Sequence, residues 1–243
     1  MIALFAALSF AVAAAVTNLV ESGAQIYAVE CAYCHGADLK GTNNGPALRG
    51  VGAADVDFML RTGRMPLEVP DTEPFSAPPQ LTPQQIASLT AFVVAHGAGS
   101  GPPIPVVHPD DALVARGRVL FDEDCQACHG SLGTGSIAGF GWLAPNMHAD
   151  TAVEIAEAIR VGPGVMPRFS PNLISQTDLD ALVAYVLSFR HPPDAGGLSL
   201  ESAGPVGEGL FAWIFGVGGC CLVMVLVGET LRTTRHPPRD EPR

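Results

Sequence analysis

The chain has 243 residues, enough for one or two domains, and carries a formal net charge of −11 at pH 7. We expect no nucleic acid among its partners, because phosphate binding requires a basic surface. Only 15% of the residues are charged and 48% are apolar, which is unusually little charge for a purely soluble protein of this size. The balance therefore indicates that part of the chain lies in a membrane.

The first predicted element is an uncharged stretch over residues 1–20, long enough to cross a bilayer as a helix. It contains AVAAA (11–15), which resembles the small-residue cleavage site of a signal peptide, but it lacks the basic residues that begin such a peptide. We expect residues 1–20 to be either a signal peptide or an N-terminal membrane anchor.

Residues 21–97 (domain 1) carry the first copy of an internal repeat. A glycine and an aromatic residue lie eight and four residues before Cys31, which places both on one face of a helix leading into CAYCH (31–35). A further helix is predicted over 81–94, where apolar residues recur at helical spacing behind the candidate N-cap Thr82.

The second copy occupies residues 110–192 (domain 2), with the same glycine and aromatic residue ahead of Cys125. Its last helix, predicted over 174–187 with Ser175 as N-cap, aligns without gaps on that of domain 1. Residues 98–109, between the copies, are rich in glycine and proline, as is typical of a linker. The sequence thus predicts an all-α fold with two tandem helical domains.

Each domain holds the pattern C-x-x-C-H, formed by Cys31, Cys34 and His35 in domain 1 and by Cys125, Cys128 and His129 in domain 2. This spacing is typical of haem c attachment, with two thioether bonds from the sulfurs and the histidine on the iron. A structural zinc site would need a second ligand pair, and none follows either motif. A redox dithiol would be expected in a βαβ pattern. Two copies in one helical frame therefore favour two covalently bound haem c groups.

Methionine is the expected second axial ligand, because His/Met ligation raises the haem potential. Met65 lies in RTGRMP and Met166 in RVGPGVMPRF, each after an Arg-x-Gly stretch and directly before proline. We predict that these two methionines bind the irons. Met59 and Met147 lack that context and are interpreted as packing residues.

A proline-containing turn follows each motif, GPAL in domain 1 and APNM in domain 2. Pro46 and Pro145 are placed to offer a backbone carbonyl to the Nδ1–H of the histidine of their own domain. Such a hydrogen bond would fix the tautomer of the axial ligand.

A predominantly apolar transmembrane helix is predicted over 209–231, after a linker over 193–208. The tail over 232–243 carries four arginines, whereas the residues from Glu21 to Glu208 hold 9 basic and 21 acidic side chains. An excess of arginine beside a membrane helix predicts a cytoplasmic tail. We therefore expect domains 1 and 2 on the extracytoplasmic face of the cell membrane.

Each domain resembles a class I cytochrome c, with a glycine–aromatic helix running into CxxCH, a proline turn, a methionine loop and a final helix. The whole order resembles the dihaem cytochrome c subunit of actinobacterial cytochrome bc complexes, as do GPALRGVGAADVDFMLRTGRMP (45–66) and GPVGEGLFAWIFG (204–216). The resemblance runs from about residue 21 to residue 231. It implies an electron-transfer subunit of a menaquinol–cytochrome c reductase, with cytochrome b and Rieske subunits as partners, that passes electrons to cytochrome c oxidase in a supercomplex.

Two other functions fit a membrane-tethered dihaem protein: a haem c subunit of another respiratory oxidase, and a catalytic dihaem protein of the peroxidase kind. Two methionines in matching contexts favour six-coordinate irons, and no repeated acid–base cluster supports peroxide chemistry. The C-terminal helix and the phrases around it favour the bc-complex subunit over another oxidase subunit. We therefore expect an electron carrier within an oxidoreductase complex, without catalytic residues of its own.

Overall fold

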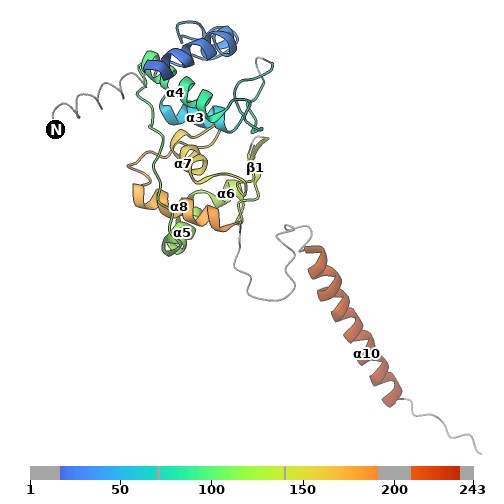
Figure 1. Ribbon diagram of the computed structural model, residues 1–243. Coiled ribbons are helices and arrows are strands. Elements are labelled where there is room, and N and C mark those ends of the chain that lie inside the picture. The colour runs from blue at the N-terminus through green and yellow to red at the C-terminus, as the bar shows by residue number, and fades with distance from the viewer. Residues whose placement is uncertain (1–16, 70–71, 140, 191–208, 236–243) are drawn as a thin grey trace, which may run out of the picture. The chain divides into compact units, whose positions relative to one another are not determined.

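The computed structural model describes residues 17–69, 72–139, 141–190 and 209–235. These belong to two compact units, Met1–His191 and Pro192–Arg243. Both cysteine motifs lie in the first unit, and the second contains one long helix (Figure 1). The predicted signal peptide or anchor over 1–20 lies almost wholly outside the described residues, as do the predicted linker over 193–208 and most of the tail.

The helices of domain 1 follow the predicted order. Residues 17–30 form a helix that ends at Cys31, and it is followed by α2 (Ala32–His35), α3 (Ala53–Arg61) and α4 (Pro83–Gly97). Thr82 caps α4: its side-chain oxygen accepts a hydrogen bond from the Gln85 N–H, and the Gln85 side chain accepts one from the Thr82 N–H. The N-cap predicted for this helix is confirmed.

Domain 2 repeats this arrangement, with η1 (Asp111–Leu113), α5 (Val114–Asp124), α6 (Gln126–His129), α7 (Ala152–Val161) and α8 (Gln176–Ser188). The predicted cap of α8 is also confirmed, since the Ser175 side chain accepts a hydrogen bond from the Asp178 N–H. The mostly helical fold class predicted from the sequence is confirmed.

One element departs from a purely helical fold. β1 (Ser136–Gly139) and β2 (Trp142–Ala144) form an antiparallel hairpin in domain 2. In domain 1 the corresponding turn contains only an isolated bridge between Thr42 and Gly45. The turn from histidine to proline spans 16 residues in domain 2 (129 to 145) and 11 in domain 1 (35 to 46). The hairpin takes up the additional length.

Each domain has its own apolar core, to which its last helix contributes one face. In domain 1 that face is formed by Ile86, Leu89 and Val93 of α4, and in domain 2 by Leu179, Leu182 and Val186 of α8. These are the residues whose spacing predicts a buried face.

The repeated glycine marks the point where the first and last helices of each domain cross. A methyl group on Gly117 of α5 would overlap the Ala181 carbonyl of α8 and lie 2.8 Å from the Tyr185 Cβ. A methyl group on Gly23 would overlap the Ser88 carbonyl of α4 in the same way. The helices approach this closely only because glycine has no side chain, so packing explains the shared residue.

We expect Gly117→Ala to lower the free energy of unfolding of the first unit by about 2–3 kcal/mol, because overpacking against a backbone carbonyl outweighs the roughly 1 kcal/mol that alanine gains in helix propensity. Thermal unfolding followed by circular dichroism measures the change. Val119→Ala, on the exposed side of α5, is the matched control and should cost far less. Equal melting temperatures for the two variants would contradict this account of the crossing.

The linker between the domains is hydrogen-bonded to both of them. The Pro102 carbonyl accepts a hydrogen bond from the Ala54 N–H of α3 at 3.1 Å. Farther along, the His108 N–H donates to the Asp180 carboxylate of α8 at 3.0 Å. The segment therefore joins the first turn of α3 to the surface of α8, and both domains belong to a single compact unit.

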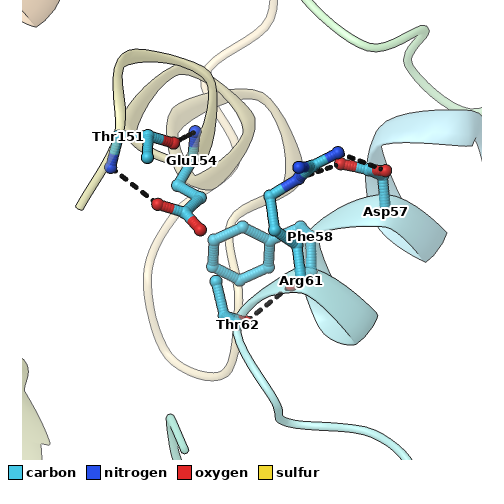
Figure 2. A network of polar contacts seen from close by, with 6 residues as sticks. All are labelled: Asp57, Phe58, Arg61, Thr62, Thr151 and Glu154. Carbon is cyan, nitrogen blue, oxygen red and sulfur yellow. Dashed lines mark hydrogen bonds and ion pairs between the residues drawn. The ribbon is translucent and has the colours of Figure 1, made fainter. Parts of the chain in front are cut away.

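The two domains also contact each other directly, through α3 and α7 (Figure 1). Asp55 accepts a hydrogen bond from the Gly52 N–H that caps α3, and its other oxygen pairs with Arg168 of domain 2 at 2.9 Å. Figure 2 shows Phe58 projecting from α3 toward α7, where Glu154 caps its own helix by accepting from the Thr151 N–H.

A second acidic residue of α7, Glu157, is fully buried at this contact. Among the described residues neither of its carboxylate oxygens has a hydrogen-bond partner of normal geometry. Burial is the main cause that raises the pKa of Glu157 to about 9; the nearby Asp57 adds to the shift and Arg61 opposes it. Asp57 itself is held by both of its oxygens to Arg61, at 2.7 and 2.9 Å. Glu157 is therefore neutral at pH 7.

Because its pKa is raised on folding, Glu157 adds stability below pH about 4.5, and that stability is lost as the pH rises toward 9. In this window the folded chain holds the extra proton, so stability falls by about 1.4 kcal/mol per pH unit from this group. Glu157→Gln stays neutral and should remove that slope in urea unfolding measured from pH 5 to 9. Glu123→Gln, an exposed carboxyl on α5, should leave the slope unchanged. An equal slope in Glu157→Gln and the natural chain would show that Glu157 is ionised in the fold.

The second unit contains one helix long and apolar enough to cross a membrane, Gly209–Leu231, with a mean hydropathy of 2.5 over its most apolar window. It starts with an α-helical turn over residues 209–211, has a π-helical segment, η2 (Ala212–Val217), and continues as α10 (Gly218–Arg235). Its side chains from Phe211 to Leu231 are exposed within this unit. These bounds agree with the helix predicted over 209–231.

Candidate haem-binding sites

The two cysteine–histidine turns have the same backbone conformation. Cys31 has φ −121° and ψ −34°, and Cys125 has φ −121° and ψ −37°. In each turn the carbonyl of this cysteine accepts the N–H of the second cysteine, at 3.2 Å, and that of the histidine, at 2.9 Å in domain 1 and 3.0 Å in domain 2. The sequence repeat is therefore also a structural repeat. In each domain it places two sulfurs and an imidazole along one short helix.

In domain 1 a single cavity brings the predicted site residues together. Its empty space is about 570 Å³, a volume that includes the open mouth. The cavity is lined by both cysteines and the histidine of the motif, Cys31, Cys34 and His35. Met65 and Pro46 line it as well. Three leucines, Leu60, Leu67 and Leu81, also line it, together with the polar Glu30 and Asn44. The donor set and the leucines fit a haem c held by two thioethers, with histidine and methionine on its iron.

The axial histidines differ in their hydrogen bonding. The Nδ1 of His35 lies 2.8 Å from the Pro46 carbonyl, which leaves Nε2 free for a metal. The Nδ1 of His129 is buried and has no hydrogen bond of normal geometry among the described residues. Burial lowers the pKa of His129, and the Pro145 carbonyl opposes that shift. Both rings are thus oriented with a proline carbonyl nearby, and domain 1 has the tighter contact.

In domain 2, Cys125 and Met166 both pack against the core cluster of that domain. Met147 is only 9% exposed and is itself a core residue, as its alignment with Leu48 indicates. Met59 lies on α3, half-buried, and its carbonyl accepts the Met65 N–H at 3.0 Å. Met65 and Met166 thus lie in the loops after α3 and α7, whereas Met59 lies on α3 and Met147 in the core of domain 2.

The first cysteine of each motif is unsuited to thiol–disulfide exchange. Burial raises the pKa of Cys31 to about 11 and that of Cys125 to about 12, and the acidic residue preceding each adds to the shift. A reactive dithiol needs a thiolate near neutral pH. In the described part of the chain no three His, Cys, Asp or Glu side chains are grouped to hold a metal ion. Both features disfavour the redox and zinc interpretations of the motif.

Two supports of the domain 1 site were not predicted from the sequence. The Tyr27 hydroxyl donates to the Gly36 carbonyl at 2.7 Å, directly behind His35. The Thr42 hydroxyl donates to the Cys34 carbonyl at 2.8 Å. The position of Tyr27 on the helix face indicates packing but not this bond, and domain 2 has Phe121 in its place.

Each domain matches a family of known proteins. Residues 20–96 match the model of the family described as cytochrome c, and residues 112–186 match that described as cytochrome c oxidase, cbb3-type, subunit III. Together with the repeated cysteine–histidine turn, these matches define a protein with two tandem cytochrome c domains, which bind haem c.

Curated relatives narrow this class. The cytochrome bc1 complex cytochrome c subunit of Corynebacterium efficiens is 33% identical over 233 residues, covering 88% of this chain and 75% of the relative. Its namesake in Mycobacterium tuberculosis is 34% identical over 209 residues, covering 82% and 74%. The CcoP subunit of the cbb3-type cytochrome c oxidase of Rhodobacter capsulatus is 30% identical over 200 residues, covering 71% and 63%. The chain belongs to the family of cytochrome bc1 complex cytochrome c subunits.

Proposed function

We propose that each chain carries two covalent haem c groups and transfers electrons between them without catalysing a reaction of its own. Cys31 and Cys34 attach one haem, and Cys125 and Cys128 attach the other. The observation that carries the proposal is the cysteine–histidine turn, which occurs twice with one backbone geometry.

The proposed iron ligands are His35 with Met65 and His129 with Met166. Haem c, when bound, supplies an iron that takes up and releases one electron at a time. With both proposed ligands bound, each iron would have no open position for a substrate. In domain 1, Pro46 orients the imidazole ring, and the leucines of the cavity wall exclude solvent. A fully ligated, apolar site of this kind favours electron transfer over the binding of a substrate.

We further propose that the chain is the haem c subunit of a quinol–cytochrome c reductase, anchored by the helix over 209–231. Cytochrome b and Rieske subunits are its partners, and cytochrome c oxidase receives its electrons in a supercomplex. The relatives named for the bc1 complex and the apolar helix Gly209–Leu231 support this assignment. The arginines of the tail support a cytoplasmic C-terminus and haem domains on the extracytoplasmic face.

Affinity purification of the full chain from mildly solubilised membranes tests this function. We expect a cytochrome b, a Rieske protein and oxidase subunits to co-purify, with two haem c per copy of this chain. A chain lacking residues 209–243 is the control and should lose these partners. Recovery of the full chain alone, or without a cytochrome b, would contradict the assignment.

A second candidate is a haem c subunit of a cbb3-type oxidase, which the family match over residues 112–186 favours. The same purification distinguishes the two functions. Oxidase subunits without a cytochrome b and a Rieske protein would support the second candidate, whereas all three together support the first.

A further inference from the structure

The last residue but one of α7, Arg160, is a buried cation that holds the methionine loop of domain 2. It is 6% exposed, and its Nη1 donates to the Phe169 carbonyl at 3.0 Å and to the Ile174 carbonyl at 2.8 Å. These carbonyls lie three and eight residues after Met166, at two points of the loop between α7 and α8. Buried carbonyls need donors, and one guanidinium serves both.

No carboxylate competes for this guanidinium. Among the described residues Arg160 makes no ion pair, and Glu157, three residues earlier, makes no hydrogen bond. The cation is therefore committed to the loop carbonyls. Charged donors form stronger hydrogen bonds than neutral ones, which suits Arg160 to fixing a loop that has no regular structure.

Other contacts fold the loop back onto the end of α7. The Phe169 N–H donates to the Ile159 carbonyl at 3.0 Å, and the Met166 N–H donates to the Pro163 carbonyl at 3.1 Å. At the start of the loop Gly162 has φ +64°, and a Cβ there would lie 2.8 Å from the Met166 carbonyl. The backbone of Met166 thus lies within a tight turn whose far side is tied to Arg160.

The equivalent residue of domain 1 has a different role. Arg61 also ends its helix two residues before a glycine, but its guanidinium binds Asp57, four residues earlier, and its side chain is 37% exposed. Domain 2 has Ala156 at the position of Asp57. Arg160 has no acidic residue four positions earlier to bind, and its guanidinium binds the loop carbonyls instead. The repeat therefore contains a natural control for this interaction.

We propose that Arg160 is a positioning residue that keeps Met166 on the haem iron of domain 2, and that Arg61 does not do so for Met65. This inference rests on the proposed function, because it takes Met166 as the axial ligand. It predicts that the methionine of domain 2 is released more easily once the two loop carbonyls lose their donor.

The test uses the full haem-loaded chain in detergent, in the Met65→His background, where any far-red methionine–iron band belongs to Met166. Adding Arg160→Gln should weaken that band. The concentration of imidazole needed to displace methionine should fall by at least about tenfold. Hydrogen–deuterium exchange of residues 162–174 should be faster. Arg160→Lys, which keeps a charged donor, should be intermediate. In the reciprocal Met166→His background, Arg61→Gln should leave the band of Met65 unchanged.

The outcomes separate this inference from the proposed function. If the Met65→His chain has no far-red band, Met166 is not a ligand, and the proposed function fails together with the inference. If the band is present and Arg160→Gln changes the imidazole concentration less than twofold, the inference alone fails, even where loop exchange is faster. If Arg160→Gln does not load haem, Arg160→Lys decides by the same criterion.

Discussion

Replacing both cysteines of one motif, by Cys125→Ala with Cys128→Ala, is expected to leave one covalent haem c on each chain instead of two. Without the two sulfurs no thioether bond forms, so haem is lost when the chain is denatured. The intact mass should fall by one haem group, and the haem absorbance per chain should halve. Cys31→Ala with Cys34→Ala should give the same count from domain 1.

The apolar helix of the second unit supplies the matched control. Cys220 and Cys221 are free cysteines of the second unit, and replacing both by alanine should leave two haems in place. A natural chain whose mass shows an internal disulfide or bound zinc in place of haem would contradict the assignment of both motifs.

Met166→His is expected to keep the iron of domain 2 six-coordinate and low-spin while lowering its reduction potential. A thioether stabilises ferrous iron better than a second imidazole does. The drop should be on the order of 0.1–0.3 V, within the range of about 0.8 V that axial ligands span. Met65→His should do the same for domain 1. Potentiometric titration followed in the haem bands measures each potential separately.

Met59 and Met147 provide the controls for this series. Met147→Leu conserves volume in the core of domain 2, and Met59→Leu changes a half-buried residue of α3. Neither should remove a methionine–iron band or move a potential by more than a few tens of millivolts. A band that vanished in Met147→Leu and persisted in Met166→His would reverse the assignment of the ligand in domain 2.

The sequence predicts the local parts of this structure well, because they depend on short-range spacing. The C-x-x-C-H turns, the caps at Thr82 and Ser175 and the buried faces of α4 and α8 all follow from patterns within about one helix length. The glycines before the motifs are visible in the sequence as part of the repeat, but the reason for them is visible only in the structure. Gly23 and Gly117 allow two helices to cross, and the partner helix begins some 60 residues later.

The contact between the domains could not be predicted, because it depends on surfaces that meet only after each domain has folded. Composition marks residues 98–109 as a linker, yet that segment is hydrogen-bonded to both domains. Glu157 belongs to an otherwise regular amphipathic helix, and only the approach of α3 makes it fully buried. The β1–β2 hairpin was missed for a simpler reason, since five extra residues in one copy of a repeat do not specify a conformation.

The different roles of Arg61 and Arg160 could be predicted from the sequence only in part. Both arginines belong to the Arg-x-Gly pattern that identifies the methionine loops, and aligning the two copies of the repeat shows Asp57 opposite Ala156. That difference indicates which arginine has a local partner. The acceptors of the other arginine, two loop carbonyls, became visible only in the folded domain.

The most direct test of the carrier function is to add a reduced quinol to the purified membrane complex under anaerobic conditions and follow the haem c bands of this chain. The account predicts two low-spin haems, both of which are reduced by quinol and reoxidised when oxygen is admitted. Neither should bind cyanide or react with peroxide before reduction. A high-spin haem that binds peroxide in the untreated complex, or haems that quinol does not reduce, would contradict the function proposed for this chain.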